Sequence, residues 1–445
     1  MGISSFVTSI FDGELPFRLE TFDGESAGPA DAPLTVKILR REALTRLLTR
    51  PGELGLARAY VAGDVDVVGS LDSLFSLRMP TVWAVLRPGP LRSLLDETGL
   101  SILRPLPPPE IETRQRGILH SRARDRKAVS HHYDVSNRFY EMVLGPSMSY
   151  SCAVFEATED SLEDAQLRKV DLIARKLDLA PGIRLLDIGC GWGTMAIHAA
   201  RSFGASVVGI TLSAPQQRYA TERARAAGVE DLVQFRLQDF RDVDDGPFDA
   251  ISSIGMFEHV GRRSIEQYTD TIFRLLRPGG RFLNHAIARP ATTDELAPRS
   301  RARELTRQLT IAAGFRGPSR IGSPFMERYV FPDGELHEVG MVVSMFQARG
   351  FEVRHLEGLR EHYVLTLRRW VSNLEQSFDA AVAEAGAQRA RAWRLYMAGS
   401  AVGFESHHLE IHQVLCVRPE EGRSHMPLRP NFEPIGAKGR TSSTV

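Results

Sequence analysis

A short glycine-rich segment is the first part of this sequence with residues that could do chemistry. It reads LLDIGCGWG at 185–193, with three glycines behind an acidic residue. Glycine lets the backbone turn tightly and approach a ligand closely, and amides at a following helix start favour electron-rich groups. The G-x-G-x-G spacing differs from the wider fingerprint of dinucleotide sites, and Asp187 would repel a diphosphate. The segment therefore predicts a site for a cationic ligand, or an ordered network of amides.

Two further polar segments follow hydrophobic strand patterns downstream. Thr211-Leu212-Ser213 stands where an NAD enzyme would carry an acidic residue that binds ribose. Leu237-Gln238-Asp239-Phe240 offers a carboxylate and an aromatic ring that could clasp an adenine. The agreement of several strand ends favours a nucleoside-like ligand over a glycine turn without function.

Glu258, His285 and Tyr329 could supply acid–base chemistry, although each also has a plain structural interpretation. Glu258 could cap a helix together with His259, His285 could be a hydrogen-bonded core histidine, and Tyr329 could be a packed aromatic. His131, His132, Cys152 and His285 include no pair with zinc-finger spacing, so no metal site is predicted.

Alternating strand and helix patterns must position these residues. Strands are expected at 183–188, 206–210, 232–237, 248–253 and 281–286, with helices at 194–203 and 215–227. Strands separated by helices of this length predict an α/β protein with a doubly wound parallel sheet.

Three regions are expected along the chain. Residues 1–118 form a small mixed domain, with a strand at 34–39, a helix at 42–48 and an Arg-rich, Pro-rich linker starting at 104. Residues 119–418 form the catalytic domain. Residues 419–445 are rich in Pro, Gly, Ser and charge, which predicts a disordered tail.

The composition excludes several classes of protein. Lys plus Arg and Asp plus Glu number 55 each, whereas a nucleic-acid binder normally shows a basic excess. Three cysteines are too few for a disulfide framework. The sequence contains no apolar run of about 18 residues, so no membrane span is predicted. The N-terminus lacks the pattern of a secretion signal, so a cytoplasmic location is expected.

From about Gly55 to Arg418 the sequence resembles the cyclopropane fatty acid synthase family of class I methyltransferases. The motifs that carry the resemblance are GLARAYVAGDVDV (55–67), HHYDVSNRFY (131–140), MSYSCAVF (148–155), LLDIGCGWG (185–193), GITLS (209–213), LQDFRD (237–242), FEHVG (257–261), NHAI (284–287), RYVFPDGEL (328–336) and HYVLTLRRW (362–370). The resemblance implies a Rossmann-like catalytic sheet and the N-terminal domain of the two-domain bacterial phospholipid enzymes.

Carried over residue by residue, the resemblance implies two ligand sites. S-adenosylmethionine is expected against Tyr133, Tyr150, Ser151, Asp187, Gly189, Cys190, Gly191, Gly193, Thr211, Leu212, Gln216, Gln238, Asp239 and Phe240. Bicarbonate is expected against Cys152, Glu258, His285, Ile287 and Tyr329, with Cys152 and Ile287 contributing mainly backbone amides.

The implied activity adds a one-carbon unit to the cis double bond of an unsaturated phospholipid acyl chain. The resulting carbocation can be stabilised by aromatic faces and deprotonated by bicarbonate, giving a cyclopropane or a methylene fatty acid, the precursor of a 10-methyl chain. The aromatic candidates are Tyr133, Phe139, Tyr150, Phe257 and Tyr329. A small-molecule methyltransferase and a non-catalytic lipid-binding protein on the same fold remain alternatives.

Two features depart from the family pattern. Ser400 stands where the family often has a cysteine in a late helix, and the Arg-rich stretch at 289–320 looks longer than usual. Arginines there and in the linker are expected to dock the protein peripherally on the inner face of the membrane, or else to be ordinary solvated charge. A homodimer is also expected.

Overall fold

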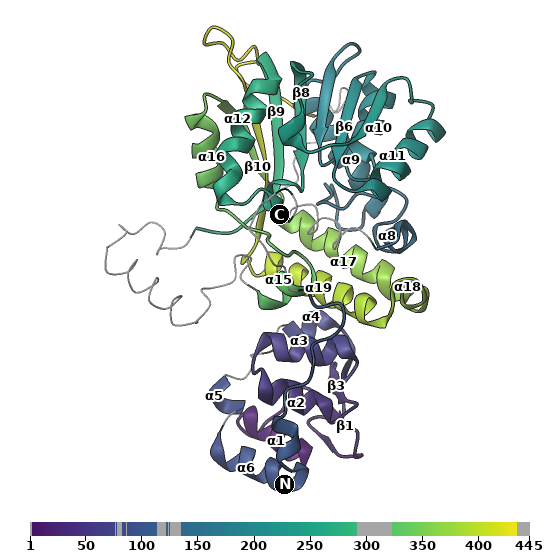
Figure 1. The fold of residues 1–445 in the computed structure, drawn as a ribbon, viewed down its shortest axis with the longest axis vertical. Helices are drawn as coiled ribbons and strands as arrows, with labels where there is room; N and C mark the ends of the chain where they lie inside the picture. Colours follow the sequence, from purple (N-terminus) through teal and green to yellow (C-terminus); the bar gives the residue numbers. More distant parts are fainter. Residues whose placement is uncertain are drawn as a thin grey trace, which may run out of the picture. The chain divides into compact units, whose positions relative to one another are not determined.

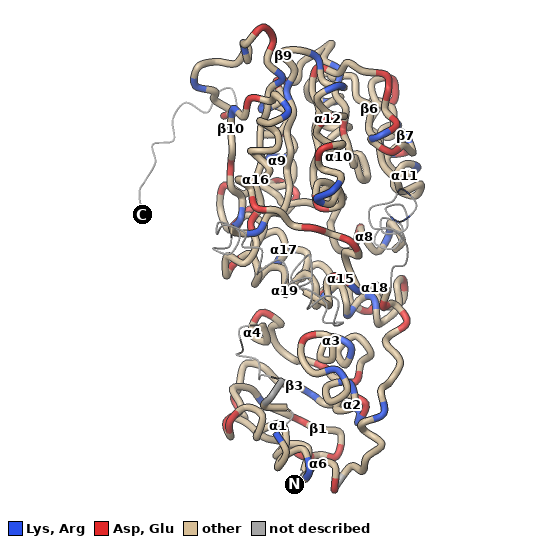
Figure 2. Tube along the Cα trace, turned by 60° about the vertical axis from the view of Figure 1, so that its left-hand side comes forward, with Lys and Arg blue, Asp and Glu red and all other residues tan. Residues whose placement is uncertain are grey.

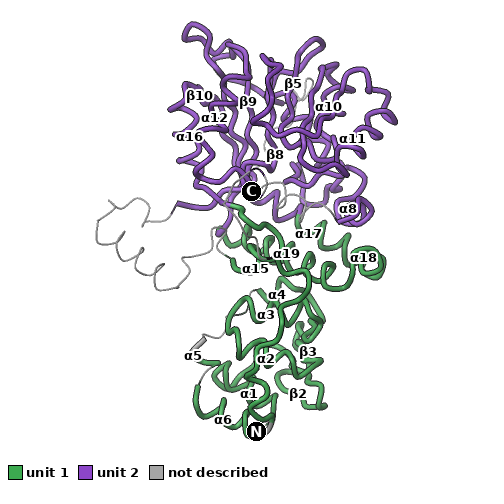
Figure 3. The backbone as a smooth tube through the Cα atoms, viewed as in Figure 1, with its two compact units in different colours: residues 1–119, 292–334, 367–407 green, residues 120–291, 335–366, 408–445 purple. Residues whose placement is uncertain are grey.

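The computed structural model describes residues 2–75, 77, 82–85, 87–113, 122, 124, 135–291 and 323–433. Its elements (Figure 1) group into two compact units, coloured separately in Figure 3. Unit 1 comprises residues 1–119, 292–334 and 367–407, and unit 2 comprises residues 120–291, 335–366 and 408–445.

A seven-stranded sheet forms the centre of unit 2, in the order β10-β11-β9-β8-β5-β6-β7. Parallel pairing joins β9, β8, β5, β6 and β7, while β11 runs antiparallel to both β9 and β10. The strands are β5 (Arg184–Ile188), β6 (Ser206–Thr211), β7 (Val233–Leu237), β8 (Phe248–Ile254), β9 (Leu276–Ala288), β10 (Glu352–Gly358) and β11 (Glu410–Val417). The predicted doubly wound α/β sheet is thus confirmed, with the late strands β10 and β11 added at one edge.

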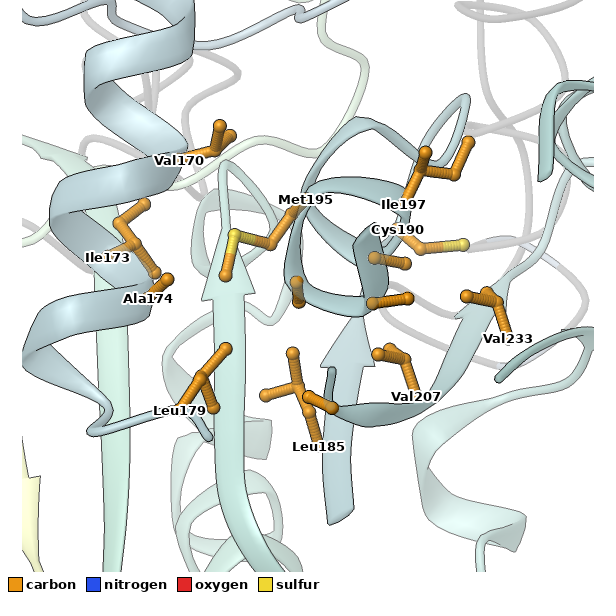
Figure 4. Close-up of a cluster of buried hydrophobic side chains, with 14 of the residues drawn as sticks. Val170, Ile173, Ala174, Leu179, Leu185, Cys190, Met195, Ile197, Val207 and Val233 are labelled. Carbon is orange, nitrogen blue, oxygen red and sulfur yellow. The ribbon is translucent and has the colours of Figure 1, made fainter. Parts of the chain in front are cut away.

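Helices cover both faces of this sheet. Adjacent residues of a strand point to opposite faces, so neighbouring residues of β5 enter different cores. Leu185 packs into the core beneath α9, α10 and α11, whereas Leu186 packs into the core beneath α12 and α16. Figure 4 shows part of the first of these cores, including Val170, Ile173 and Ala174 of α9 and Leu185 of β5. The helices and turns of unit 2 are α8 (Asn137–Leu144), α9 (Leu162–Lys176), α10 (Thr194–Phe203), α11 (Ala214–Ala226), η2 (Phe240–Asp242), η3 (Phe257–His259), η4 (Arg262–Ser264), α12 (Ile265–Leu275) and α16 (Val339–Ala348).

Unit 1 combines a four-stranded sheet, in the order β2-β1-β3-β4, with helices from three parts of the chain. Its elements are α1 (Ile3–Ile10), β1 (Arg18–Thr21), β2 (Ser26–Ala27), β3 (Thr35–Ile38), α2 (Glu42–Thr49), α3 (Glu53–Ala62), β4 (Val65–Val68), α4 (Leu71–Phe75), α5 (Val82–Val85), α6 (Pro88–Thr98), η1 (Leu100–Leu103), α15 (Pro324–Tyr329), α18 (Phe378–Ala385) and α19 (Ala387–Glu405). The helix α17 (Arg360–Gln376) begins in unit 2 and ends in unit 1. Within unit 1, α19 packs closely on α4, since a Cβ at Gly399 would lie 2.9 Å from the Phe75 ring.

The units divide the chain differently from the expected boundaries. The first segment of unit 1 ends at 119, close to the expected 118, but residues 323–334 and 367–407 also belong to this unit. The beginning of the segment expected to be a disordered tail packs within unit 2. Phe432 and Met426 pack on its hydrophobic core, and Arg175 Nε donates to the Phe432 carbonyl oxygen at 2.6 Å. A few apolar side chains thus anchor a polar segment up to 433, and 434–445 lie outside the described residues.

Across the described parts of the chain, no helix is both long and apolar enough to span a bilayer. Basic and acidic residues are interspersed along these parts rather than gathered into one block (Figure 2).

Candidate active site

The predicted site residues of unit 2 lie at or just after the carboxyl ends of its parallel strands. Asp187 is the last but one residue of β5, and Thr211 ends β6. Asp239 follows β7, Glu258 follows β8, and His285 lies near the end of β9. Because parallel strands end at one edge of a sheet, this arrangement brings together residues separated by up to about a hundred positions.

The glycine loop between β5 and α10 has a backbone that ordinary residues rarely adopt. Gly189, Gly191 and Gly193 have φ angles of 77°, 53° and 84°. A Cβ at Gly193 would lie 2.6 Å from the Phe235 ring, whereas a Cβ at Gly191 would meet no described atom within 4 Å. Gly193 therefore serves packing, while Gly191 borders space that a ligand can occupy.

Asp187 is buried behind this loop. Its Oδ1 accepts a hydrogen bond from Ser252 Oγ at 2.7 Å, and Oδ2 has no partner among the described residues. Burial raises the pKa of the carboxyl to about 6, although Ser252 and the charge of Lys169 act in the opposite direction. Burial and the nearby Asp187 also raise the pKa of the Cys190 thiol, which disfavours its thiolate.

The turn after β6 is held by its own side chains. Thr211 Oγ1 donates to Gln216 Oε1 at 2.8 Å and accepts from the Ser213 amide at 3.2 Å. Ser213 Oγ in turn accepts from the Gln216 amide at 3.4 Å and caps α11, while Leu212 is half-buried. Thr211 and Gln216 therefore shape this turn.

The segment after β7 is fixed by an ion pair. The Asp239 carboxylate accepts from Arg241 Nε at 2.8 Å and from Arg241 Nη2 at 2.6 Å. Burial alone would raise the pKa of Asp239, but the bonds from Arg241 outweigh it and lower the pKa. Gln238 Nε2 donates to the Asp242 carbonyl oxygen at 2.9 Å, and Phe240 is half-buried.

Two α9 side chains that the sequence analysis missed hold the segment around Tyr150 and Ser151. Lys169 Nζ donates to Ser151 Oγ at 2.8 Å, and Gln166 Nε2 donates to the Ser151 carbonyl oxygen at 2.9 Å. Tyr150 itself is half-buried. Burial lowers the pKa of Lys169 to about 8, although nearby Cys152 and Asp187 raise it.

A signal for these residues was present in the sequence. Gln166, Lys169 and Lys176 fall on the same helical face as the buried Val170 and Ile173. Polar residues at apolar positions of an amphipathic helix indicate a buried polar network, and this spacing could have drawn attention to them.

Cys152 is fully buried in unit 2. Its Sγ lies 3.3 Å from the Ala153 carbonyl oxygen and 3.6 Å from that of Leu359, and burial raises the pKa of the thiol. A thiol in this environment is a poor nucleophile.

Glu258 connects the turn after β8 to β9. Its Oε1 accepts from the Ile287 amide at 2.7 Å, while Oε2 is buried without a partner in the described parts of the chain. Burial raises the pKa of Glu258 to about 7, partly offset by the Ile287 amide. The carboxylate therefore bonds a neighbouring strand and does not cap a helix. The Ile287 amide, expected to contact an ion, donates to Glu258 in this structure.

His285 is fully buried on β9, two residues before Ile287. Its Nδ1 lies 3.1 Å from Gln413 Nε2, and its Nε2 has no partner among the described residues. Burial, with the charges of Lys169 and Lys176, holds the pKa of His285 well below its ordinary value, so the ring is neutral. A hydrogen-bonded core histidine would explain the partner of Nδ1, but not a buried Nε2 that has no partner among the described residues.

Tyr329 belongs to unit 1, where its hydroxyl donates to Glu112 Oε2 at 2.9 Å. Arg58 binds the same carboxylate through two nitrogens at 2.7 Å, and Arg328 Nη1 donates to it at 2.9 Å. The single hydroxyl proton of Tyr329 is thus used, and its oxygen remains as an acceptor. Tyr133, expected to contact the methyl donor, lies outside the described residues.

Two of the aromatic candidates prove to be core residues. Phe139 is fully buried beside Tyr140, and Phe257 packs within the core under α12 and α16. Among the described aromatic candidates of unit 2, Tyr150 is the one that is only half-buried.

Comparisons with known proteins identify the family of this chain. The sequence profile of the mycolic acid cyclopropane synthetase family matches residues 120–414. A probable fatty acid methyltransferase of Mycobacterium tuberculosis is 42% identical over 440 residues, which cover 95% of this chain and 96% of that protein. The cyclopropane-fatty-acyl-phospholipid synthase of Escherichia coli is 31% identical over 390 residues, 88% of this chain and 89% of that protein.

Solved structures give the same result. A mycolic acid cyclopropane synthase in complex with SAH and CTAB matches with a TM-score of 0.57 and 30% identity, covering 66% of this chain and 98% of its own. A glycine loop, a sheet of this order and these relatives lead to one conclusion. The chain belongs to the mycolic acid cyclopropane synthetase family and is a methyltransferase with the fold that binds S-adenosylmethionine.

Proposed function

We propose that this methyltransferase adds a one-carbon unit to the cis double bond of an unsaturated phospholipid acyl chain. The similarity to the M. tuberculosis and E. coli proteins extends over nearly the whole chain, including the first segment of unit 1. The observation that carries the proposal is a pair of buried polar atoms, Glu258 Oε2 and His285 Nε2, without partners among the described residues. Buried polar atoms of this kind normally find a hydrogen-bond partner, so the pair suits a small polar ligand.

Two ligands fit the residues at the strand ends. When bound, S-adenosylmethionine supplies an electrophilic methyl group, and bicarbonate supplies a proton acceptor. Asp187 and the loop at Gly191 would hold the methyl donor, because the loop leaves open space there and a buried carboxyl lies behind it. Glu258 and His285 would hold the ion.

The residues around the ion site would act by position and by exclusion of water. The Ile287 amide fixes one oxygen of Glu258, which leaves the other oxygen as an acceptor for an O–H group. Cys152 is buried and uncharged, and this supports a role in packing instead of nucleophilic attack. The half-buried Tyr150 would present its ring to a developing positive charge.

Mass spectrometry of lipids from cells that express the protein tests this function. Cells supplied with an unsaturated fatty acid should accumulate phospholipids that have gained one CH2 group, and chain fragmentation should distinguish a cyclopropane from a methylene branch. Cells that express Gly191→Val serve as the control. Unchanged lipids from a protein that still binds S-adenosylmethionine would favour the small-molecule methyltransferase, or a lipid-binding protein without turnover.

A further inference from the structure

A chain of buried hydrogen bonds reaches His285 from the side of unit 2 that carries β10 and β11. His285 and Gln413 are directly opposed in the register of β9 with β11, and Gln413 Nε2 lies 3.1 Å from His285 Nδ1. On the other side of the amide, Lys176 Nζ donates to Gln413 Oε1 at 2.7 Å and pairs with Glu357. Lys176, Gln413 and His285 are all fully buried.

Lys176 determines which way the Gln413 amide is turned. An ammonium group carries three donors and no acceptor, so the amide oxygen must face Lys176 and the amide nitrogen must face His285. An amide nitrogen only donates. His285 Nδ1 must therefore accept, which places the proton of the neutral ring on Nε2.

We infer that Lys176 and Gln413 are positioning residues that fix His285 as the Nε2–H tautomer and so make it a hydrogen-bond donor toward the ion site. This inference deepens the proposed function and rests on it for the identity of the ion. His285 then does not remove a proton from the substrate, because its Nε2 lone pair is not available. Glu258 Oε2 presents an acceptor and His285 Nε2 a donor, and this pair matches an anion that has one O–H group and unprotonated oxygens.

The tautomer can be measured directly by nitrogen NMR on protein labelled with 15N-histidine. The sequence has 13 histidines, and the signals that disappear in His285→Gln assign His285. In the wild type at neutral pH we expect an unprotonated Nδ1 and a protonated Nε2. A wild-type ring that carries its proton on Nδ1 would overturn the inference, whatever reaction the enzyme performs.

Gln413→Glu provides the decisive variant. The new carboxylate can only accept, from Lys176 on one side and from His285 on the other, so we expect Nδ1 to become protonated while the side-chain size is kept. An Nδ1 that stays unprotonated in the folded variant contradicts the proposed relay. Gln347→Glu, an exposed position on α16, is the matched control and should leave the His285 signals unchanged. If Gln413→Glu does not fold, Lys176→Met is the alternative variant. Without the ammonium group the Gln413 amide can turn either way, so we expect a mixture of the two His285 tautomers.

Turnover separates this inference from the proposed function. Measured on unsaturated phospholipid at fixed bicarbonate, Lys176→Met should lose about 100-fold in kcat, as expected when the orientation of a donor to an anion is lost. Lys176→Arg, which also only donates, should recover part of that loss. Full activity of Lys176→Met would overturn the positioning role. Absence of lipid methylation by the wild type would instead count against the proposed function and leave the tautomer result standing.

Discussion

Burial shifts Glu258 and His285, the two central side chains of the proposed ion site, toward their neutral forms. Loss of water disfavours the charged form of either group, so it raises the pKa of Glu258 to about 7 and lowers that of His285. A carboxyl with a pKa of about 7 changes its charge near neutral pH. Its protonation state therefore becomes a measurable property of the site.

Glu258 should impose a rising limb on the pH profile of the reaction. If the ionised carboxylate accepts the O–H group of the ion, kcat/KM should increase as pH rises through about 7. Glu258→Gln should reduce turnover by roughly 100-fold or more and remove this limb, while the affinity for S-adenosylmethionine remains. Rates are measured with the bicarbonate concentration held constant at each pH.

The same residue should appear in the stability of the protein. Between the ordinary carboxyl pKa of 4.5 and about 7, the folded state holds one more proton at Glu258 than the unfolded state. The free energy of unfolding should therefore fall as pH rises through this window, and less steeply in Glu258→Gln. In the kinetic test, a turnover of Glu258→Gln within a few-fold of wild type would show that Glu258 takes no part in the mechanism.

Ser400 should not act as a nucleophile. It is half-buried on α19 in unit 1, and methyl transfer needs no covalent enzyme intermediate because the donor carries its own leaving group. Ser400→Ala should keep most of the activity in the lipid assay. A loss of several orders of magnitude would show that this position takes part in the chemistry.

At the scale of elements, two glycines of the loop between β5 and α10 have different surroundings. A Cβ at Gly193 would clash with the Phe235 ring, whereas a Cβ at Gly191 would meet no described atom within 4 Å, so Gly191 is the one proposed to border the ligand. Both have positive φ angles, which other residues adopt at a cost.

Gly191→Val should therefore abolish binding of S-adenosylmethionine while the protein remains folded, although somewhat less stable. Titration calorimetry measures the affinity, and thermal unfolding measures the stability. Gly193→Val is the matched control, because its side chain would meet Phe235 and should lower the melting temperature much more. Unchanged affinity in folded Gly191→Val would refute the assignment of the donor site.

At the scale of the whole molecule, equal numbers of basic and acidic residues leave the charge balanced, and both signs are interspersed along the described chain (Figure 2). The arginines expected to contact a membrane fall largely outside the described residues, among them Arg114, Arg116, Arg126, Arg299, Arg301, Arg303 and Arg307. Of the linker arginines that are described, Arg122 forms an ion pair with Asp242 at 2.9 Å.

We expect the protein to bind anionic vesicles through the arginines of the linker and of the stretch at 289–320, and to bind them less tightly as the salt concentration increases. Each arginine near an anionic surface contributes about 1 kcal/mol, and salt screens this attraction. Co-sedimentation with anionic liposomes measures the binding, with charge reversal of Arg301 and Arg303 as the test variant. Binding that ignores both salt and charge reversal would indicate apolar contacts instead.

The sequence by itself determined the parts of this protein that depend on local pattern. The strands at 184–188, 206–211, 233–237 and 248–254 lie within one or two residues of their expected positions, because hydrophobic period and glycine placement are local properties. The same holds for the glycine loop and for the residues at the strand ends.

Only the tertiary structure decided the partners of the site residues. Glu258, in the turn after β8, meets the Ile287 amide 29 residues further along the chain. His285 meets Gln413, 128 residues away, through the register of β9 with β11. Burial of Lys176 beneath β11 then fixes the Gln413 amide. A pattern in the sequence predicts which face of an element is buried. It does not predict which side chain lies opposite on a distant strand, and this choice fixes the proton on His285.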